Sequence, residues 1–298
     1  MAAALTVGMV SCSSEDELDK GPVEYDPEEE LPEGALPGKF SIDVGGSYVY
    51  FSKGNLRANY NKNSWTWSFS PNQWDYVGNA SNNINITGDG TVDSGGDNLY
   101  VDLFGWSTKK TYYGIHNSKE KYTYFYLFKD WGNVDGIGKG WRTLTRKEWE
   151  YLLCDRVKCG TVFGTPEAHY TYATIRTDVN GGVNGIILFP DDISISASEV
   201  TTAGPVNDGS GDYETKCTSA QWTALEAKGC VFLPVAGCRI GNKVHDDGEC
   251  GYYWSSSLIT DGLFASTAYC TILDTRNPDL RFTDLYYGCS VRLVHEAS

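Results

Sequence analysis

The fold class predicted for this chain depends on residues 141–151, Trp-Arg-Thr-Leu-Thr-Arg-Lys-Glu-Trp-Glu-Tyr. Thr145 and Glu148 have the spacing of a capping box, in which each side chain bonds the backbone N–H of the other residue. This pattern predicts a helix over Lys147–Leu153. The apolar residues of that segment are expected on its buried side: Trp149, Leu152 and Leu153.

A second capping box, Thr218-Ser-Ala-Gln221, lies further along the chain. It predicts a helix over Gln221–Lys228 that ends at Gly229. Trp222 and Leu225 are three residues apart and therefore share one face of that helix. Both helices are thus expected to pack a tryptophan against a core.

Short β-forming segments lie on either side of the two helices. They cluster or alternate aromatic and β-branched residues between Gly, Asn and other turn residues. The main ones are Phe40–Val44, Tyr48–Phe51, Trp65–Phe69, Gly185–Pro190, Val231–Ala236, Tyr252–Ser256, Ala268–Leu273 and Ser290–Val294. Two helices with many non-repeating strands predict an α+β domain, with two main helices and several short antiparallel sheets.

Composition limits the function. The chain of 298 residues is 41% hydrophobic, which is enough for a core, and its formal net charge is −15 at pH 7. Such a charge argues against nucleic acid as a partner, because phosphates would be repelled. No run of 18 apolar residues is present, so a membrane-spanning helix is not expected.

The N-terminal part has a different composition. Met9-Val10-Ser11-Cys12 matches a loose lipobox, so residues 1–12 are predicted to be a truncated lipoprotein signal with lipidation at Cys12. Residues 13–37 are rich in acids and Pro and are predicted to form a stalk. The acids directly after the cysteine resemble a surface-export signal. We therefore expect a lipid-anchored protein of the outer membrane that faces the cell exterior.

Residues 38–298 contain no linker of similar composition and are predicted to form one domain. Several segments resemble a C-type-lectin-like family of surface lipoproteins from gut anaerobes. They are Val49–Leu56, Asp102–Trp106, Trp141–Tyr151, Val183–Asp192, Gly229–Gly237, Gly251–Ser257 and Cys289–Val294. The resemblance implies an enlarged C-type-lectin-like fold, which formylglycine-generating enzymes share. Trp141, Trp149, Trp254 and Tyr253 are expected in the core, and Arg292 is expected to pair within the fold.

Residues 252–294 resemble the variable region of a diversity-generating retroelement target. Randomised Asn codons in such regions cannot yield Lys, Glu, Gln, Met or Trp, and residues 258–289 contain none of the five. The resemblance implies a surface-displayed binding protein, an adhesin or receptor-binding type, whose ligand is a protein or glycan on another cell, phage or host surface. The predicted ligand-binding residues are Ile259, Thr260, Asp261, Leu263, Phe264, Ser266, Cys270, Ile272, Asp274, Arg276, Asp279, Leu280, Phe282, Asp284, Tyr286 and Tyr287.

Two alternatives remain open beside this interpretation. One is an enzyme with the fold of the formylglycine-generating enzymes, in which Cys270 and Cys289 would be the reactive cysteines. The other is a glycan-binding lectin module, because Asn277-Pro278-Asp279 is similar to half of a calcium-dependent lectin motif. No catalytic residue, cofactor or metal is predicted. Eight of the nine cysteines follow residue 150, and their pairing is not determined by the sequence.

Overall fold

The computed structural model describes residues 30–61, 64–78, 83, 86, 99–109, 111–119, 127–209, 212–259, 267–274 and 277–297. The chain divides into two units, Met1–Glu30 and Leu31–Ser298. Every helix and strand described below belongs to the second unit. The predicted lipidation site Cys12 and most of the predicted stalk lie outside the described residues.

The structure is mostly β-sheet, with 44% strand and 11% helix, so the prediction of an α+β fold is wrong. Both capping boxes are present, but the helices they open are short. Helix α2 covers Arg146–Glu150 and continues as a single π-helical segment, η2, over Tyr151–Asp155. Helix α3 covers Ser219–Ala227. A capping box marks where a helix begins and does not determine its length, and strands make up four times as much of the structure as helices do.

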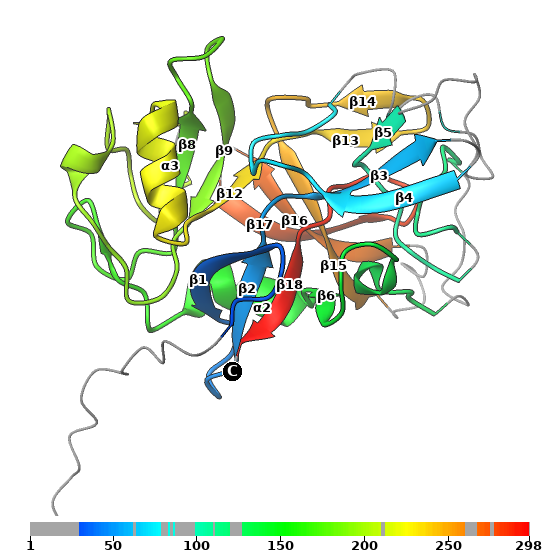
Figure 1. Ribbon diagram of the computed structural model, residues 1–298, viewed down its shortest axis with the longest axis horizontal. Helices are drawn as coiled ribbons and strands as arrows, with labels where there is room; N and C mark the ends of the chain where they lie inside the picture. The colour runs from blue at the N-terminus through cyan, green and yellow to red at the C-terminus, as the bar shows by residue number, and fades with distance from the viewer. Residues whose placement is uncertain are drawn as a thin grey trace, which may run out of the picture. The chain divides into compact units, whose positions relative to one another are not determined.

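Three larger sheets and one pair carry most of the fold (Figure 1). The strand order of the first sheet is β1-β2-β18-β6, and its strands are Ala35–Ser41, Tyr48–Ser52, Leu293–Ala297 and Trp141–Thr143. The second has the order β11-β8-β9-β12, with Thr215–Lys216, Tyr170–Ile175, Val183–Leu188 and Val231–Pro234. The third is β15-β16-β17, with Gly251–Leu258, Thr267–Asp274 and Asn277–Asp284. The pair is β13-β14, with Cys238–Ile240 and Lys243–His245.

Smaller elements complete the described chain. A further sheet has the order β4-β3-β5, with Ser64–Phe69, Leu56–Asn61 and Leu99–Val101. Strands β7 and β10, Thr161–Val162 and Ser194–Ile195, form a parallel pair. Two short 3₁₀ helices, η1 and η3, cover Trp131–Asn133 and Ala197–Glu199. Because β1 begins at Ala35, the last residues of the predicted stalk of residues 13–37 belong to the first sheet.

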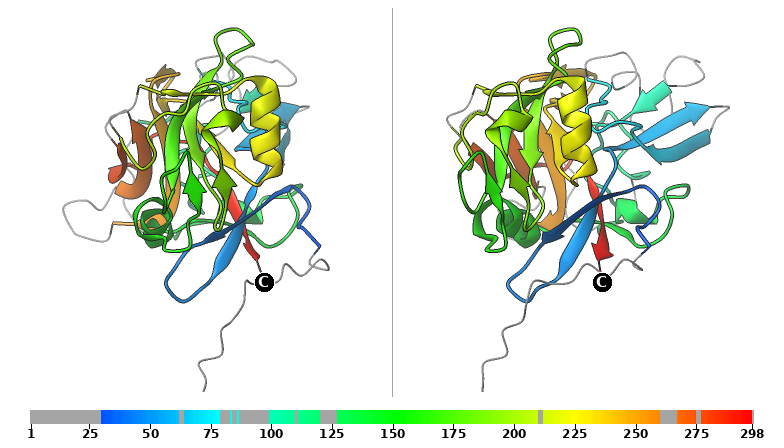
Figure 2. Two further views of the ribbon diagram at one scale, coloured as in Figure 1. Left: turned by 90° about the vertical axis from the view of Figure 1, so that its left-hand side faces the viewer. Right: turned by 60° about the vertical axis from the view of Figure 1, so that its left-hand side comes forward.

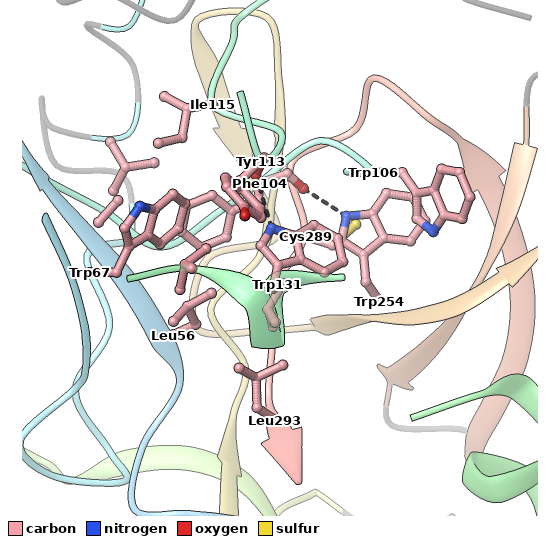
Figure 3. Close-up of a cluster of buried hydrophobic side chains, with 14 of the residues drawn as sticks. Leu56, Trp67, Phe104, Trp106, Tyr113, Ile115, Trp131, Trp254, Cys289 and Leu293 are labelled. Carbon is pink, nitrogen blue, oxygen red and sulfur yellow. Dashed lines mark hydrogen bonds between the residues drawn. The ribbon is translucent and has the colours of Figure 1, made fainter. Parts of the chain in front are cut away.

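The sheets bury three apolar clusters. Cluster 1 contains Trp106, Trp131 and Trp254, and Figure 3 shows these rings beside Phe104 and Cys289. Cluster 2 contains Phe51, Trp149 and Tyr253. Cluster 3 lies where α3 covers the sheet of β8 and β9 (Figure 2), and its centre is Trp222 against Phe232, with ring centroids 5.6 Å apart.

The predicted core residues are confirmed. Trp149, Trp254 and Tyr253 are fully buried, and Trp141 is 6% exposed. Arg292 is 1% exposed and pairs within the fold, where its guanidinium donates to Gln73 Oε1 at 2.6 Å and to Asn55 Oδ1 at 3.3 Å. These two amide oxygens accept from the Nη1 and Nη2 groups of the buried guanidinium, and burial lowers the pKa of Arg292 to about 10.

Candidate functional site

The predicted binding segment, residues 258–289, folds mainly as strands β16 and β17. Thr260, Asp261, Leu263, Phe264, Ser266 and Arg276 lie outside the described residues. Strand β16 is the central strand of its sheet and pairs antiparallel with β15 and with β17. Along β17, every residue from Asn277 to Asp284 has a partner in β16. Strand β17 therefore forms one edge of this sheet.

The two faces of this sheet lie against different clusters. Residues that are directly paired across strands point to the same face. Trp254 pairs with Cys270, which places both on the face toward cluster 1. Tyr253 pairs with Thr271 on the opposite face, toward cluster 2. Both faces touch core, and the exposed side chains among the described residues of this sheet lie on its outer strand β17: Asp279, Arg281 and Phe282.

Three of the predicted ligand-binding residues are buried. Cys270 is fully buried, and Ile259 and Ile272 are each 8% exposed. Cys270 and Ile272 belong to cluster 1. They are core residues, because their strand lies in the middle of the sheet. These three are therefore not part of an accessible surface, and the surface considered below excludes them.

The remaining predicted residues differ in their surroundings. Asp279 and Arg281 lie two residues apart on β17, with half-exposed side chains, and Arg281 Nε donates to Asp279 Oδ2 at 2.8 Å. Leu280 is partly buried against cluster 2. The backbone oxygen of Asp274 accepts a hydrogen bond from the Tyr172 hydroxyl.

After β17 the chain turns and carries two neighbouring tyrosines. Tyr286 and Tyr287 have ring centroids 5.1 Å apart, and the N–H of Tyr287 donates to the backbone oxygen of Asp284 at 3.0 Å. Both rings are partly exposed, whereas Leu285 is 1% exposed. Burial raises the pKa of Tyr286 to about 12, so its hydroxyl is neutral at physiological pH.

Among the described residues of the segment, Phe282 is the most exposed aromatic residue, at 48%. It pairs with Tyr269 on β16, so the two rings share one face of the sheet. The guanidinium of Arg146 lies 4.5 Å from the centroid of the Tyr269 ring, and its Nη1 donates to the Tyr269 hydroxyl at 3.4 Å. We call Arg146, Tyr269 and Phe282 the edge patch.

Helix α2 positions the arginine of the edge patch. Arg146 is the first residue of this helix, and its backbone N–H donates to Ser257 Oγ on β15 at 3.0 Å. Its guanidinium lies 3.8 Å from Glu150 one turn later. The capping box at Thr145 therefore fixes a cation beside the aromatic rings of the sheet. The sequence prediction did not include Arg146 or Tyr269, because their proximity depends on strand pairing.

The cysteines of the enzyme alternative are deeply buried. Cys270 and Cys289 are both 0% exposed, and burial raises the pKa of each thiol well above its usual value. A nucleophilic cysteine needs a thiolate that a substrate can reach. These two thiols are neutral and enclosed by cluster 1, which does not favour catalysis at either position.

Other features of the described chain share no residue with the edge patch. A hollow of ≈ 540 Å³ is lined by residues 132–136 and 138–141, and none of the predicted binding residues lines it. Within the described ranges, no group of three or more His, Cys, Asp or Glu side chains is placed to hold a metal ion. No helix in the part of the chain described here is long and apolar enough to cross a membrane.

Comparisons with protein-family models, with curated proteins and with solved structures find no match to this chain.

Proposed function

We propose that this protein binds a ligand at the cell surface, and that the contact is made by side chains of residues 258–289 together with Arg146. The observation that carries this proposal is the edge patch, where Phe282 is 48% exposed opposite Tyr269 and a guanidinium stacks on the tyrosine ring. Aromatic residues and Arg supply most of the binding energy at protein interfaces when a partner covers them.

The division between buried and exposed residues supports the same proposal. Ala268, Cys270 and Leu273 anchor β16 in the core, while Asp279, Arg281 and Phe282 lie exposed on the edge strand. Substitutions on such an edge change the surface without changing the packing beneath it. A segment with this division tolerates varied residues at its surface, as the resemblance to a diversified variable region requires.

The proposed location is the outer membrane, with a lipid on Cys12 as the only membrane contact. The ligand would then be a protein or glycan on another cell, a phage or a host surface. We expect that Cys12→Ala releases the protein from membranes into the soluble fraction and abolishes incorporation of radiolabelled palmitate. Ser11→Ala is the matched control, because it keeps the thiol. Palmitate incorporation that persists in the Cys12→Ala protein contradicts the assignment.

Binding through the edge is tested with the double variant Arg281→Ser, Phe282→Ser in the full chain. Both side chains are exposed, so the free energy of unfolding should stay within about 0.5 kcal/mol of the wild-type value. Affinity for a ligand found by screening cell surfaces and glycan arrays should fall at least about tenfold, or roughly 1.4 kcal/mol.

Tyr112→Ser is the matched control, because Tyr112 is a 51% exposed aromatic residue outside the predicted segment. This control should bind as the wild type does. A folded double variant with unchanged affinity, or an equal loss in the control, contradicts the proposed surface. A ligand that is lost with chelator and regained with calcium would instead favour the lectin alternative.

A further inference from the structure

Two cysteines face each other where β13 meets the end of the binding segment. Arg239 of β13 and Gly288 form an antiparallel bridge and exchange both backbone hydrogen bonds, at 2.8 and 2.7 Å. The next opposed positions along the two chains are Cys238 and Cys289. In an antiparallel ladder, the two residues next to a pair that exchanges both hydrogen bonds have Cα atoms roughly 4.5 Å apart, and their side chains point to the same face.

We propose that Cys238 and Cys289 form a disulfide in the mature protein. Disulfides span Cα separations of roughly 4.4–6.8 Å, which the opposed positions satisfy. Cys289 is also held on its other side, where it exchanges backbone hydrogen bonds with Phe104, both at 2.9 Å. Figure 3 shows this cysteine within cluster 1. Both cysteines are thiols in the structure, with Cys238 3% exposed and Cys289 fully buried.

The neighbouring cysteines are placed less well for a bond with either partner. Gly237 and Gly251 form a parallel bridge, so Cys250 lies diagonally across from Cys238 on the adjacent strand, displaced by two residues. The Cα atoms of such diagonal neighbours are about 7–8 Å apart. Strand β15 lies between Cys270 and Cys289, because it pairs with β16 on one side and bridges Ser290 on the other. That arrangement separates the two residues by two strand spacings, or about 9–10 Å.

Formation of the bond is an oxidation. Each thiol loses one proton and one electron as the S–S bond forms, and a small-molecule disulfide such as oxidised glutathione accepts them and leaves as two thiols. The burial of both cysteines requires that the exchange takes place during folding, before the β-strands close over them. The predicted export of the chain would deliver it to an oxidising compartment.

The bond would close a loop that contains residues 239–288, and therefore strands β15, β16 and β17. The effect of the bond on the ligand-binding surface rests on the proposed function, whereas the existence of the bond does not. A covalent link that closes this loop would hold strand β17 in place whichever residues vary at its surface. The constraint acts mainly by reducing the freedom of the unfolded chain.

The first experiment is peptide mapping of the full chain after folding with a mixture of reduced and oxidised glutathione. Free thiols are alkylated in denaturant without reduction, and the digest is analysed by mass spectrometry. We expect one cross-linked species that joins the peptides of Cys238 and Cys289, and that disappears when reductant is added before alkylation. Alkylation of both residues, or a link from either one to Cys250 or Cys270, overturns the proposal.

The second experiment measures melting with and without reductant. The wild-type melting temperature should fall by roughly 5–15 °C in reductant. The double variant Cys238→Ala, Cys289→Ala should melt at the same temperature in both conditions, while Cys154→Ser, at an exposed cysteine, should respond as the wild type does. A wild type that is insensitive to reductant overturns the proposal. Because ligand binding is not measured, failure here is distinct from failure of the proposed function.

Discussion

Replacing Trp149 by Ala is expected to lower the free energy of unfolding by about 3–5 kcal/mol. Trp149 is fully buried in cluster 2, with its ring centroid 6.3 Å from that of Phe51 and 6.4 Å from that of Tyr253. Its indole N–H donates to the backbone oxygen of Trp254 at 3.4 Å. Truncation leaves a cavity between α2 and the sheet of β15–β17, and that cavity cannot close without moving either element.

The matched control is Lys147→Ala, on the exposed side of the same short helix. It should change the free energy of unfolding by no more than about 0.5 kcal/mol. Chemical denaturation followed by tryptophan fluorescence and by circular dichroism measures both variants. A loss below about 1 kcal/mol for Trp149→Ala would mean that α2 does not contribute to the core as the structure indicates.

Local signals predicted the N-caps of both helices correctly, although α2 and α3 begin one and two residues before the predicted starts, at Arg146 and Ser219. The side chain of Thr145 accepts from the N–H of Glu148, and the side chain of Thr218 accepts from the N–H of Gln221, as the capping boxes require. These contacts span three residues and need no knowledge of the rest of the fold. The predicted α+β class was wrong because helices make up only 11% of the structure against 44% for strands, although the helical segments 146–155 and 219–227 are no shorter than predicted.

Strand β17 shows a second limit of the sequence. Pro278 suggested half of a lectin motif, and the residues after it showed no clear alternation. In the structure Pro278 pairs with Leu273 on an edge strand, where a missing N–H donor is tolerated. The irregular pattern arises because both faces of the sheet are partly buried. Alternation between apolar and polar residues is expected only when one face is in water.

The candidate site remains a prediction, and its details depend on the fold. Residues 258–289 were proposed from a resemblance to a variable region, and the absence of five residue types agrees with that resemblance. Burial of Cys270 and Ile272 could not be inferred, since it depends on β16 being the central strand. Arg146 was missed because more than a hundred residues separate it from Tyr269. Contacts of that kind require the fold.

His116 should make the protein labile in acid. Its side chain is 3% exposed, and burial, together with the charge of Arg239, lowers its pKa to about 3. A methyl group at Gly105 would come within 2.4 Å of His116 Nε2, which shows how closely the backbone encloses the ring. In the unfolded chain the imidazole titrates near its ordinary pKa of about 6.5. Between these two pKa values the unfolded state therefore binds a proton that the folded state does not bind.

The contribution of His116 to stability is complete above pH 6.5 and is lost progressively as the pH falls toward 3. At pH 4 the loss amounts to about 3 kcal/mol relative to pH 7. Asp102 acts in the opposite direction. Burial raises its pKa from the ordinary 3.8 to about 6, so the folded state loses stability as the pH rises between these two values. This second effect cancels when a His116 variant is compared with the wild type at each pH.

The measurement is urea denaturation at pH 7 and pH 4 of the wild type, His116→Gln and His245→Gln. The wild type should lose about 3 kcal/mol more between the two pH values than His116→Gln does, because glutamine cannot take up a proton in the unfolded state. The matched control His245→Gln removes an exposed histidine of β14 and should follow the wild type. Equal losses in the wild type and in His116→Gln would contradict a buried neutral imidazole. An equal, intermediate loss in both variants would instead assign the acid lability to the overall charge of the protein.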